Sequence, residues 1–299
     1  MLAINPSRRN LSLPLAEACD WMKGHLGKNP NARNELNYIT YWKSSKFAHW
    51  SLAALRDWDL ITWRKEVLDE DNAKDQGVGP AALVGAQTCI HRMNALSKVV
   101  QTWGRAHRIT LDNPIKPGVR PRPPKGRERR LYPEEEELLL KAAEKSSRSW
   151  LRAAIVIAVE TGIRQAELVD LTWTRVNLDR QFLDLTRTKN GRLRRVPLSN
   201  RAIEAFRSLP SFRDTVLPIE TTNGIMQAFR DINTFPDLRW HDLRHEAISR
   251  LFEYTDLRDH EVMAISGHLS PAMLSRYTHL RTDRLADRLR GGRLNARAE

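Results

Sequence analysis

The chain has 299 residues and a formal net charge of +13, a length that suits one large domain or two of ordinary size. The positive excess favours a polyanionic partner, either nucleic acid or an anionic membrane surface. No apolar run reaches the roughly 20 residues that span a bilayer, and residues 1–15 lack the pattern of a secretory signal. The two cysteines, Cys19 and Cys89, have no metal-ligand spacing and suit a reducing cytoplasm. We therefore expect nucleic acid, and not a membrane, as the partner.

Residues 1–112 predict a helical domain without a convincing strand signal. Helical patterns run over residues 15–26, 31–47 and 52–68 and, after a polar gap, over residues 81–107. Six of the nine tryptophans lie in this region, so we expect indole rings to pack its core. Several of its basic side chains are candidates for contacts with DNA phosphates: Lys43, Lys46, Lys98 and Arg105.

Residues 113–130 form the clearest domain boundary. They hold five prolines and two glycines, a composition that prevents helix and predicts an extended linker. Seven basic side chains against Glu128 leave an excess of +6. This charge suits a strap that neutralises duplex phosphates, although a solvated spacer has the same composition. The seven candidate phosphate contacts are Lys116, Arg120, Arg122, Lys125, Arg127, Arg129 and Arg130.

Near the start of residues 131–299, Pro133 is followed by four glutamates, which is a helix-starting pattern. Residues 150–160 are nearly all apolar and predict a buried helix. Gly162 ends that helix and Arg164 opens a short new one, so its guanidinium would emerge beside free backbone N–H groups as an anion site. Glu167, one turn later, is placed to orient either Arg164 or a neighbouring histidine. The alternative for this stretch is a capped helix with a surface ion pair.

The pattern then changes to period two. Residues 176–178, 182–185 and 193–198 read as short strands, and Asn190-Gly191 predicts a tight hairpin between the last two. Lys189 stands at the lip of that turn, from which its ammonium could reach an oxygen in a duplex groove. Two further helical stretches follow. The predicted fold is mainly α with a small antiparallel β-sheet (α+β).

The stretch from Trp240 to Tyr277 holds the side chains that carry chemistry. His241 and Arg244 lie one helical turn apart and share a face. His268 precedes Ser270-Pro271, which would cap and start a helix that carries Tyr277 near its end. Two imidazoles, a guanidinium and a phenol together suit attack on a phosphate whose charge is held by fixed cations.

These motifs, taken in order, resemble those of the tyrosine recombinases, also called phage-integrase-type site-specific recombinases. The agreement runs through residues 131–280, and the linker and helical N-terminal region look like the core-binding domain of that family. The last segment resembles most the invertases that rearrange shufflons. The motifs are Thr161-Gly162-Ile163-Arg164-Gln165-Ala166-Glu167-Leu168, Thr188-Lys189-Asn190-Gly191, His241-Asp242-Leu243-Arg244, Gly267-His268 and Arg276-Tyr277.

The resemblance implies a C-shaped clamp of two domains around double-stranded DNA and strand transfer without metal, nucleotide or other cofactor. It implies a homo-tetramer on two specific sites, with a monomer or dimer before synapsis and a tail helix at residues 283–289 as a possible connector. The resemblance implies that Tyr277 is the nucleophile that forms a 3′-phosphotyrosyl link, and that Arg164 and Arg244 clamp the phosphate. It implies that Lys189 donates a proton to the leaving 5′ oxygen and that His241 accepts the tyrosine proton. It also implies that His268 is a hydrogen-bond partner of the phosphate and that Glu167 supports the site.

Two alternatives use the same residues. A type IB topoisomerase-like enzyme would nick and reseal DNA without exchanging strands. A non-catalytic DNA-binding protein would keep the site as a relic. Whether a recombinase of this kind integrates, excises or inverts DNA is not written in the sequence.

Overall fold

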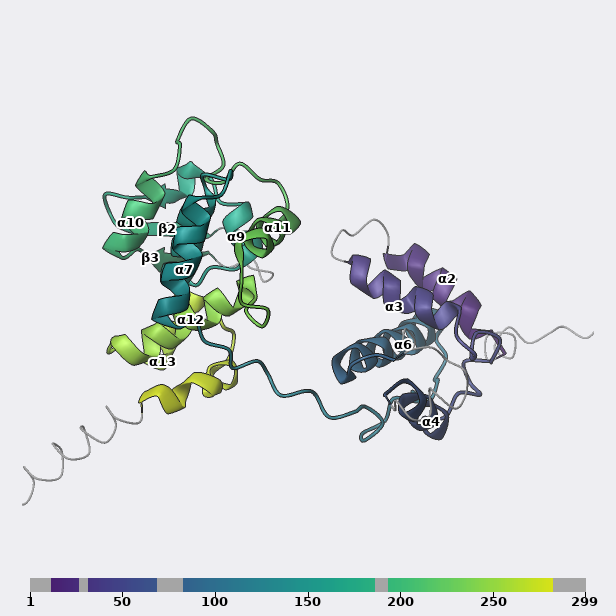
Figure 1. Cartoon of the computed structure of the whole chain (residues 1–299). Helices are drawn as coiled ribbons and strands as arrows, with labels where there is room; N and C mark the ends of the chain where they lie inside the picture. Colours follow the sequence, from purple (N-terminus) through teal and green to yellow (C-terminus); the bar gives the residue numbers. More distant parts are fainter. Residues whose placement is uncertain (1–11, 27–31, 69–82, 186–192, 282–299) are drawn as a thin grey trace, which may run out of the picture. The chain divides into compact units, whose positions relative to one another are not determined.

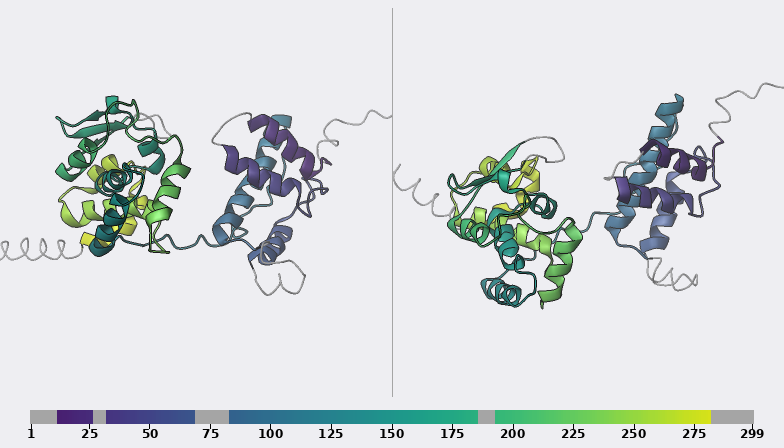
Figure 2. Two further views of the ribbon diagram at one scale, coloured as in Figure 1. Left: turned by 45° about the horizontal axis from the view of Figure 1, so that its top comes forward. Right: turned by 90° about the horizontal axis from the view of Figure 1, so that it is seen from above.

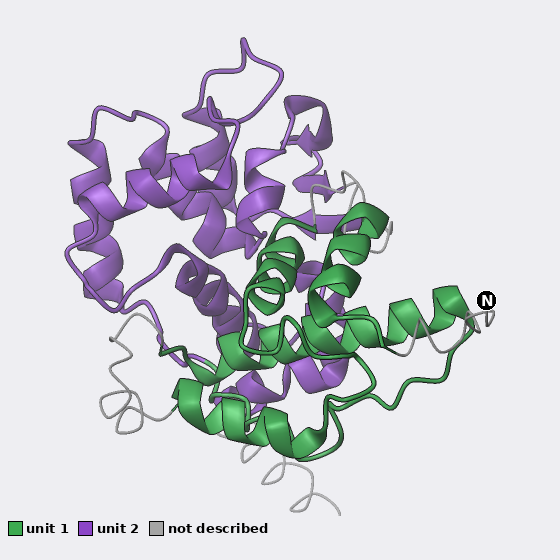
Figure 3. Cartoon of the chain, turned by 90° about the vertical axis from the view of Figure 1, so that its right-hand side faces the viewer, with its two compact units in different colours: residues 1–126 green, residues 127–299 purple. Residues whose placement is uncertain are grey.

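The computed structural model describes residues 12–26, 32–68, 83–185 and 193–281, which divide into two structural units at Gly126 and Arg127 (Figure 3). This division falls inside the predicted linker, residues 113–130. Ile115 and Val119 are buried in the core of the first unit. The first part of the predicted linker is therefore folded onto the N-terminal helices, and only its last four residues belong to the second unit.

The first unit is helical, as its periodicity predicts. Its longest helix contacts the other three, so their apolar faces enclose a common core (Figure 1). The predicted patterns are longer than the helices that form at residues 31–47 and 52–68. The helices are α2 (Leu15–Leu26), α3 (Arg33–Lys43), α4 (Asp57–Leu68) and α6 (Ala86–His107).

Indole rings fill only part of this core. Trp42 is fully buried and its Nε1 donates to the carbonyl of Arg92 (2.6 Å). Trp63 is also buried and donates to the Tyr41 hydroxyl (2.9 Å). Trp58, by contrast, is 62% exposed. The expectation of a core packed by indoles is therefore wrong for Trp58, because this ring lies on the outward face of α4, and also for Trp50, which is 41% exposed.

The second unit combines helices with a small antiparallel sheet, which confirms the predicted fold class. The sheet has the order β1-β2-β3, and Leu183 on β2 faces Val196 on β3 with both side chains buried. The elements are α7 (Pro133–Glu144), α8 (Leu151–Thr161), α9 (Gln165–Val169), η3 (Trp173–Arg175), β1 (Val176–Asn177), β2 (Phe182–Leu185), β3 (Arg194–Pro197), α10 (Asn200–Arg207), α11 (Thr222–Ile232), α12 (Trp240–Tyr254), α13 (Asp259–Ser266), η4 (Pro271–Met273) and η5 (Ser275–Arg281).

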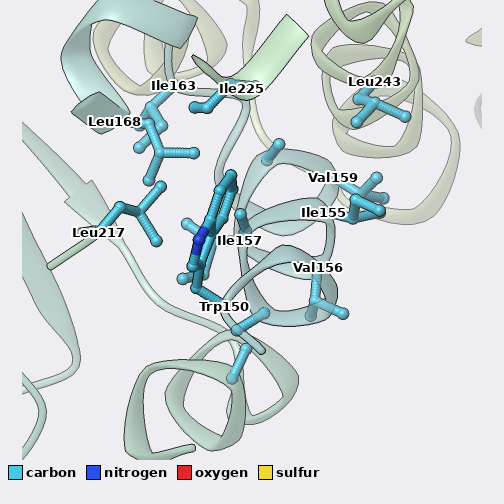
Figure 4. Packing of buried hydrophobic residues seen from close by; sticks show 14 of the residues in the cluster. Trp150, Ile155, Val156, Ile157, Val159, Ile163, Leu168, Leu217, Ile225 and Leu243 are labelled. Atoms are coloured by element: carbon cyan, nitrogen blue, oxygen red, sulfur yellow. The ribbon is translucent and has the colours of Figure 1, made fainter. Parts of the chain in front are cut away.

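The core of the second unit surrounds α8, the helix predicted to be buried. Figure 4 shows Ile157 on the side of this helix that faces Trp150 and Leu217, and Ile155 and Val159 on the opposite side. The helix contacts α7, α10 and α12. Because it is covered on several sides, its side chains are apolar all around. Because α8 is held so firmly, the residues at its C-terminal end have a fixed position.

The last described segment runs beside α12 (Figures 1 and 2). The sequence predicts one helix starting near Ser270, but the chain forms two 3-10 helices, η4 and η5. The Tyr277 amide bonds to the carbonyl of Leu274, three residues earlier, as such tight turns require. The predicted Asn190-Gly191 turn with Lys189, and the predicted tail helix at residues 283–289, lie outside the described residues.

Candidate active site

The end of α8 places Arg164 and Glu167. Gly162 closes the helix with a φ of 60°, a left-handed conformation in which a glycine costs little. Arg164 follows in an extended conformation as the N-cap of α9. Its backbone N–H donates to Glu167 Oε2 (2.7 Å) and its Nη1 donates to Glu167 Oε1 (2.9 Å). One carboxylate therefore caps α9 and holds the guanidinium, whose side chain remains 39% exposed.

A second guanidinium joins this carboxylate from the sheet. Arg194, the first residue of β3, is buried and its Nη2 donates to Glu167 Oε2 (2.6 Å), while its Nη1 donates to the carbonyl of Ser266. Sequence reasoning missed Arg194, because an arginine in an alternating strand is usually solvent-exposed. Its neighbour Gly267 has a φ of 70°, and a Cβ there would collide with the Arg194 guanidinium. The glycine before His268 is thus required twice, by its backbone conformation and by this close approach.

Arg244 is the most enclosed of the three guanidiniums. It lies on α12 with 5% of its surface exposed, and it donates to the carbonyls of Gly162 and, at 2.6 Å, of Ser266. Both carbonyls belong to helix C-termini, where the backbone carries partial negative charge. Among the described residues, no carboxylate forms an ion pair with Arg244. Burial, and after it the charges of Arg164 and Arg194, lower the pKa of Arg244 to about 10.

The three guanidiniums leave this site with an excess of positive charge. Within the described ranges, Arg164 and Arg194 share the carboxylate of Glu167, and Arg244 donates to backbone carbonyls without a carboxylate partner. A buried cation without a matching anion is costly. An incoming phosphate would supply the missing negative charge and accept bonds from planar forks that fit its geometry.

Two histidines from the motifs border the guanidiniums. His268 follows the end of α13, and its Nδ1 lies 2.8 Å from the Ser266 hydroxyl. Burial, followed by Arg244 and Arg164, lowers the pKa of His268 to about 4. Burial and then Arg244 also lower the pKa of His241. Both rings are therefore neutral near pH 7, and each can donate one N–H and accept one proton.

Tyr277 on η5 is buried beside α12, with 5% of its surface exposed. Its ring stacks on Phe252 with centroids 5.9 Å apart. Burial raises the pKa of Tyr277, an effect that Arg276, Arg244 and Arg130 oppose. The hydroxyl is therefore protonated at neutral pH, and any attack by this oxygen requires a group that removes the proton.

The hydroxyl of Tyr277 is bonded to a residue that sequence reasoning missed. Its oxygen lies 2.5 Å from Nδ1 of His245, whereas the family resemblance gives the role of proton acceptor to His241. The sequence signal for His245 was its spacing, since it follows His241 by one helical turn. In the structure the rings of His241 and His245 meet edge to face, with centroids 4.9 Å apart. Such i,i+4 pairs are common on helices, so spacing alone could not single it out.

The basic residues at the start of the second unit have carboxylate partners. Arg127 pairs with Asp242 (3.0 Å), and Arg129 pairs with Glu135 (2.6 Å) and Asp237 (2.7 Å). Arg130 pairs with two further carboxylates of α12, Glu246 (2.6 Å) and Glu253 (2.7 Å). These three predicted phosphate contacts thus hold the strap, residues 127–130, against its own unit.

The basic candidates in the first unit are more accessible. Arg122 and Lys125 are exposed, and the paired lysines keep between 41% and 52% of their side-chain surface in solvent. Arg105 and Arg120 donate to neutral amide oxygens. The lysine pairs are Lys43 with Asp20, Lys46 with Glu66, Lys98 with Glu35 and Lys116 with Asp112.

The described residues contain no group of three or more His, Cys, Asp or Glu side chains placed to hold a metal ion. Within the same ranges, none of the helices has the length and apolar character that a membrane span requires.

Comparisons with known proteins show the family of this chain. Residues 129–284 match the model of the phage integrase family. The chain is 39% identical over 190 residues to the shufflon-specific DNA recombinase of Escherichia coli, which covers 62% of this chain and 48% of that protein. It is 25% identical over 292 residues to the tyrosine recombinase XerD of Vibrio vulnificus (strain YJ016), covering 89% of each. The chain thus spans about half the length of the shufflon-specific recombinase.

Solved structures share the fold. The Tn1549 transposon integrase in complex with transposon right end DNA superposes with a TM-score of 0.71 at 16% identity, over 93% of this chain and 99% of that one. A lambda integrase dimer bound to a COC′ core site gives 0.68 at 20% identity, over 92% and 80%. Since the family match covers more than half of the sequence and includes Arg164, Arg244, His268 and Tyr277, this chain belongs to the phage integrase family.

Proposed function

We propose that this chain is a site-specific DNA recombinase that cuts and rejoins strands through a tyrosine. The observation that carries the proposal is the site itself. Arg164, Arg194 and Arg244 converge with a shortage of negative charge, close to a buried tyrosine whose hydroxyl is bonded to an imidazole. A phosphodiester meets both needs, because it brings an anion to the guanidiniums and an electrophilic phosphorus to the tyrosine.

In the proposed step, the Tyr277 oxygen attacks the scissile phosphorus. An O–P bond forms to the tyrosine while its proton passes to a histidine of α12, the bond from phosphorus to the 5′ oxygen breaks, and a 3′-phosphotyrosyl link results. Arg164 and Arg244 stabilise the charge on the non-bridging oxygens, and Glu167 and Arg194 keep Arg164 in place. Lys189 is the proposed proton donor to the leaving oxygen. Because the link conserves the bond energy, attack by another 5′ hydroxyl reverses the step and joins strands.

The proposed partner is double-stranded DNA in the cytoplasm, gripped by both units as a clamp. Exposed basic side chains of the first unit would bind phosphates. Two lambda integrase structures support assembly on DNA, a dimer bound to a core site and a tetramer bound to a Holliday junction. We accordingly propose a tetramer on two recombination sites, with the tail at residues 283–289 as connector. We also propose a reaction of the kind for which the shufflon-specific recombinase is named.

Covalent trapping tests the function. The probe is a nicked duplex cut from DNA that flanks the gene, so that the fragment released after cleavage prevents religation. Wild-type protein should form an adduct, whereas Tyr277→Phe should bind the duplex and form none. Tyr254→Phe is the matched control, because Tyr254 is 72% exposed on the same unit and should cut normally.

Two outcomes would overturn the proposal. If Tyr277→Phe still forms the adduct, the nucleophile is a different residue. If wild-type protein relaxes supercoiled plasmids of any sequence and never joins strands from two duplexes, the enzyme is a topoisomerase of the same chemistry.

A further inference from the structure

His245 contacts the oxygen that the proposed reaction uses. Its Nδ1 lies 2.5 Å from the Tyr277 hydroxyl, a short distance for a hydrogen bond between neutral groups. The two side chains reach each other because η5 runs along the face of α12 that carries His241, His245 and Phe252. Phe252 supports the tyrosine ring from the side, so the hydroxyl has a defined position next to the imidazole.

The protonation states of His245 and Tyr277 allow a proton to pass from the tyrosine to the histidine. Burial, and after it His241 and Arg276, lower the pKa of His245 to about 4, so the imidazole is neutral at pH 7. The tyrosine is protonated at the same pH because burial raises its pKa. A neutral imidazole with its proton on Nε2 presents a lone pair at Nδ1, and the tyrosine O–H is the donor that faces it.

We infer that His245 positions the Tyr277 hydroxyl and takes its proton when the oxygen attacks phosphorus, an assignment that rests on the proposed function. As the O–P bond forms, the O–H bond breaks, and the proton moves to Nδ1. The electron pair of the broken P–O bond leaves on the 5′ oxygen, which receives a proton from a separate donor. The incoming phosphate adds negative charge near His245 and so favours its protonated form.

The groups around His245 come from four segments. A cavity of about 190 Å³ lies beside His245 and Tyr277 and is lined by the strap and by η5. A bound phosphate adds negative charge to this set of groups. The pKa of His245 therefore depends on the phosphate as well as on its charged neighbours. The titratable and charged groups that face it are His241, Asp242 and Arg244 on α12, Arg276, Tyr277 and His279 on η5, His268 after α13, and Arg127, Glu128, Arg129 and Arg130 on the strap.

A first experiment tests the contact without DNA. In protein labelled with ¹⁵N-histidine, the Nδ1 signal of His245, assigned by its disappearance in His245→Asn, should shift in Tyr277→Phe. It should remain in place in Tyr254→Phe. If Tyr277→Phe leaves the signal unchanged, the hydrogen bond does not exist in solution and the inference fails, whatever the protein does to DNA.

A second experiment tests proton transfer. Asparagine at position 245 keeps an acceptor near the place of Nδ1 but cannot take a proton at neutral pH. His245→Asn should therefore form the covalent adduct about 10²-fold more slowly than wild type at pH 7, within the usual range for the removal of general base catalysis. The deficit should shrink about tenfold for each pH unit gained toward the tyrosine pKa, because hydroxide then replaces the missing acceptor.

A duplex with sulfur in place of the bridging 5′ oxygen separates His245 from the proton donor. A thiolate leaves without a proton, so this duplex should rescue variants that lack the donor but not His245→Asn. His260→Asn, an exposed histidine on α13, is the matched control and should react like wild type on both duplexes.

The inference is overturned if His245→Asn cuts at the wild-type rate, if its deficit does not change with pH, or if the sulfur duplex restores it. A faster His245→Ala would also overturn it, since the contact would then restrain the tyrosine. Failure of wild-type protein to form any adduct would instead contradict the proposed function. The Nδ1 signal of His245 would still show whether the hydrogen bond to Tyr277 forms.

Discussion

Two groups of arginines in the second unit differ in how their charge is matched. On the strap, Arg127, Arg129 and Arg130 each have at least one carboxylate partner. In the active site, Arg164 and Arg194 share Glu167, and Arg244 donates to backbone carbonyls. An arginine that is paired with carboxylates therefore stabilises the fold, whereas an arginine without a matching carboxylate can bind an anionic ligand.

The pKa values of the strap arginines move in the opposite direction from those of Arg194 and Arg244. Hydrogen bonds to Asp242 and to Glu135 raise the pKa of Arg127 and of Arg129, and those to Glu253 and Glu246 do the same for Arg130 against the effect of burial. Burial lowers the pKa of Arg194 and of Arg244. Mutations of the strap should therefore change stability, and mutations of the active-site group should change the rate of DNA cleavage.

The largest expected effect follows from Arg244. Lysine keeps the charge but does not have the planar fork that reaches a phosphate and two carbonyls together. Arg244→Lys should lower the rate of covalent adduct formation about 10²- to 10³-fold, the usual cost of removing one group that stabilises a transition-state oxyanion. Arg152→Lys, in an exposed pair with Glu144, is the control and should react normally. Equal rates for both variants would mean that Arg244 only supports the fold.

A smaller effect is expected at Arg130. Arg130→Met removes hydrogen bonds to the buried Glu246, and bonds to charged groups contribute about 1.5–3 kcal/mol. The free energy of opening of α12, measured by hydrogen exchange, should fall by about 2–3 kcal/mol at pH 7. Arg152→Met should leave it nearly unchanged, because its pair is exposed. A normal α12 in Arg130→Met would show that the strap is not held by these pairs.

The same variant has a predicted pH dependence. Burial opposes ionisation of Glu246, but hydrogen bonds from Arg130 and Arg250 prevail and lower its pKa below the ordinary 4.5. A carboxylate with a lowered pKa stabilises the folded state above the unfolded value and loses this effect as the pH falls through the folded value. The difference between wild type and Arg130→Met should therefore be full above pH 4.5 and decrease below it.

The smallest effect concerns DNA affinity. Replacing Lys116, Arg120 and Arg122 with glutamine should weaken binding to target and random duplex alike. It should also reduce the salt slope of log K by about 0.9 for each phosphate that the variant no longer neutralises. Arg127→Gln is the contrasting variant, and it should leave the slope unchanged because Arg127 pairs with Asp242. If only Arg127→Gln lowers the salt slope, the strap contacts the phosphates and these three residues of the first unit do not.

The sequence by itself determined much of the fold. Hydrophobic period and helix-end signals act over a few residues, so the buried α8, the turn at Gly162 and the short strands could be predicted locally. The ordered motifs likewise identified the family. The limits of local reasoning are visible at η4 and η5, where the chain forms tight turns beside α12 in place of the single helix that Ser270-Pro271 predicts.

Only the tertiary structure decided how the charged and titratable groups are paired. The strap arginines and their α12 acids are more than 100 residues apart in the chain, as are Arg164 and the Gly267 carbonyl. Tyr277 and His245 are brought together in the same way, from separate elements. Composition gives a charge excess but not its location, because the interaction of two charges depends on their distance and burial, and both are set by packing between segments remote in sequence.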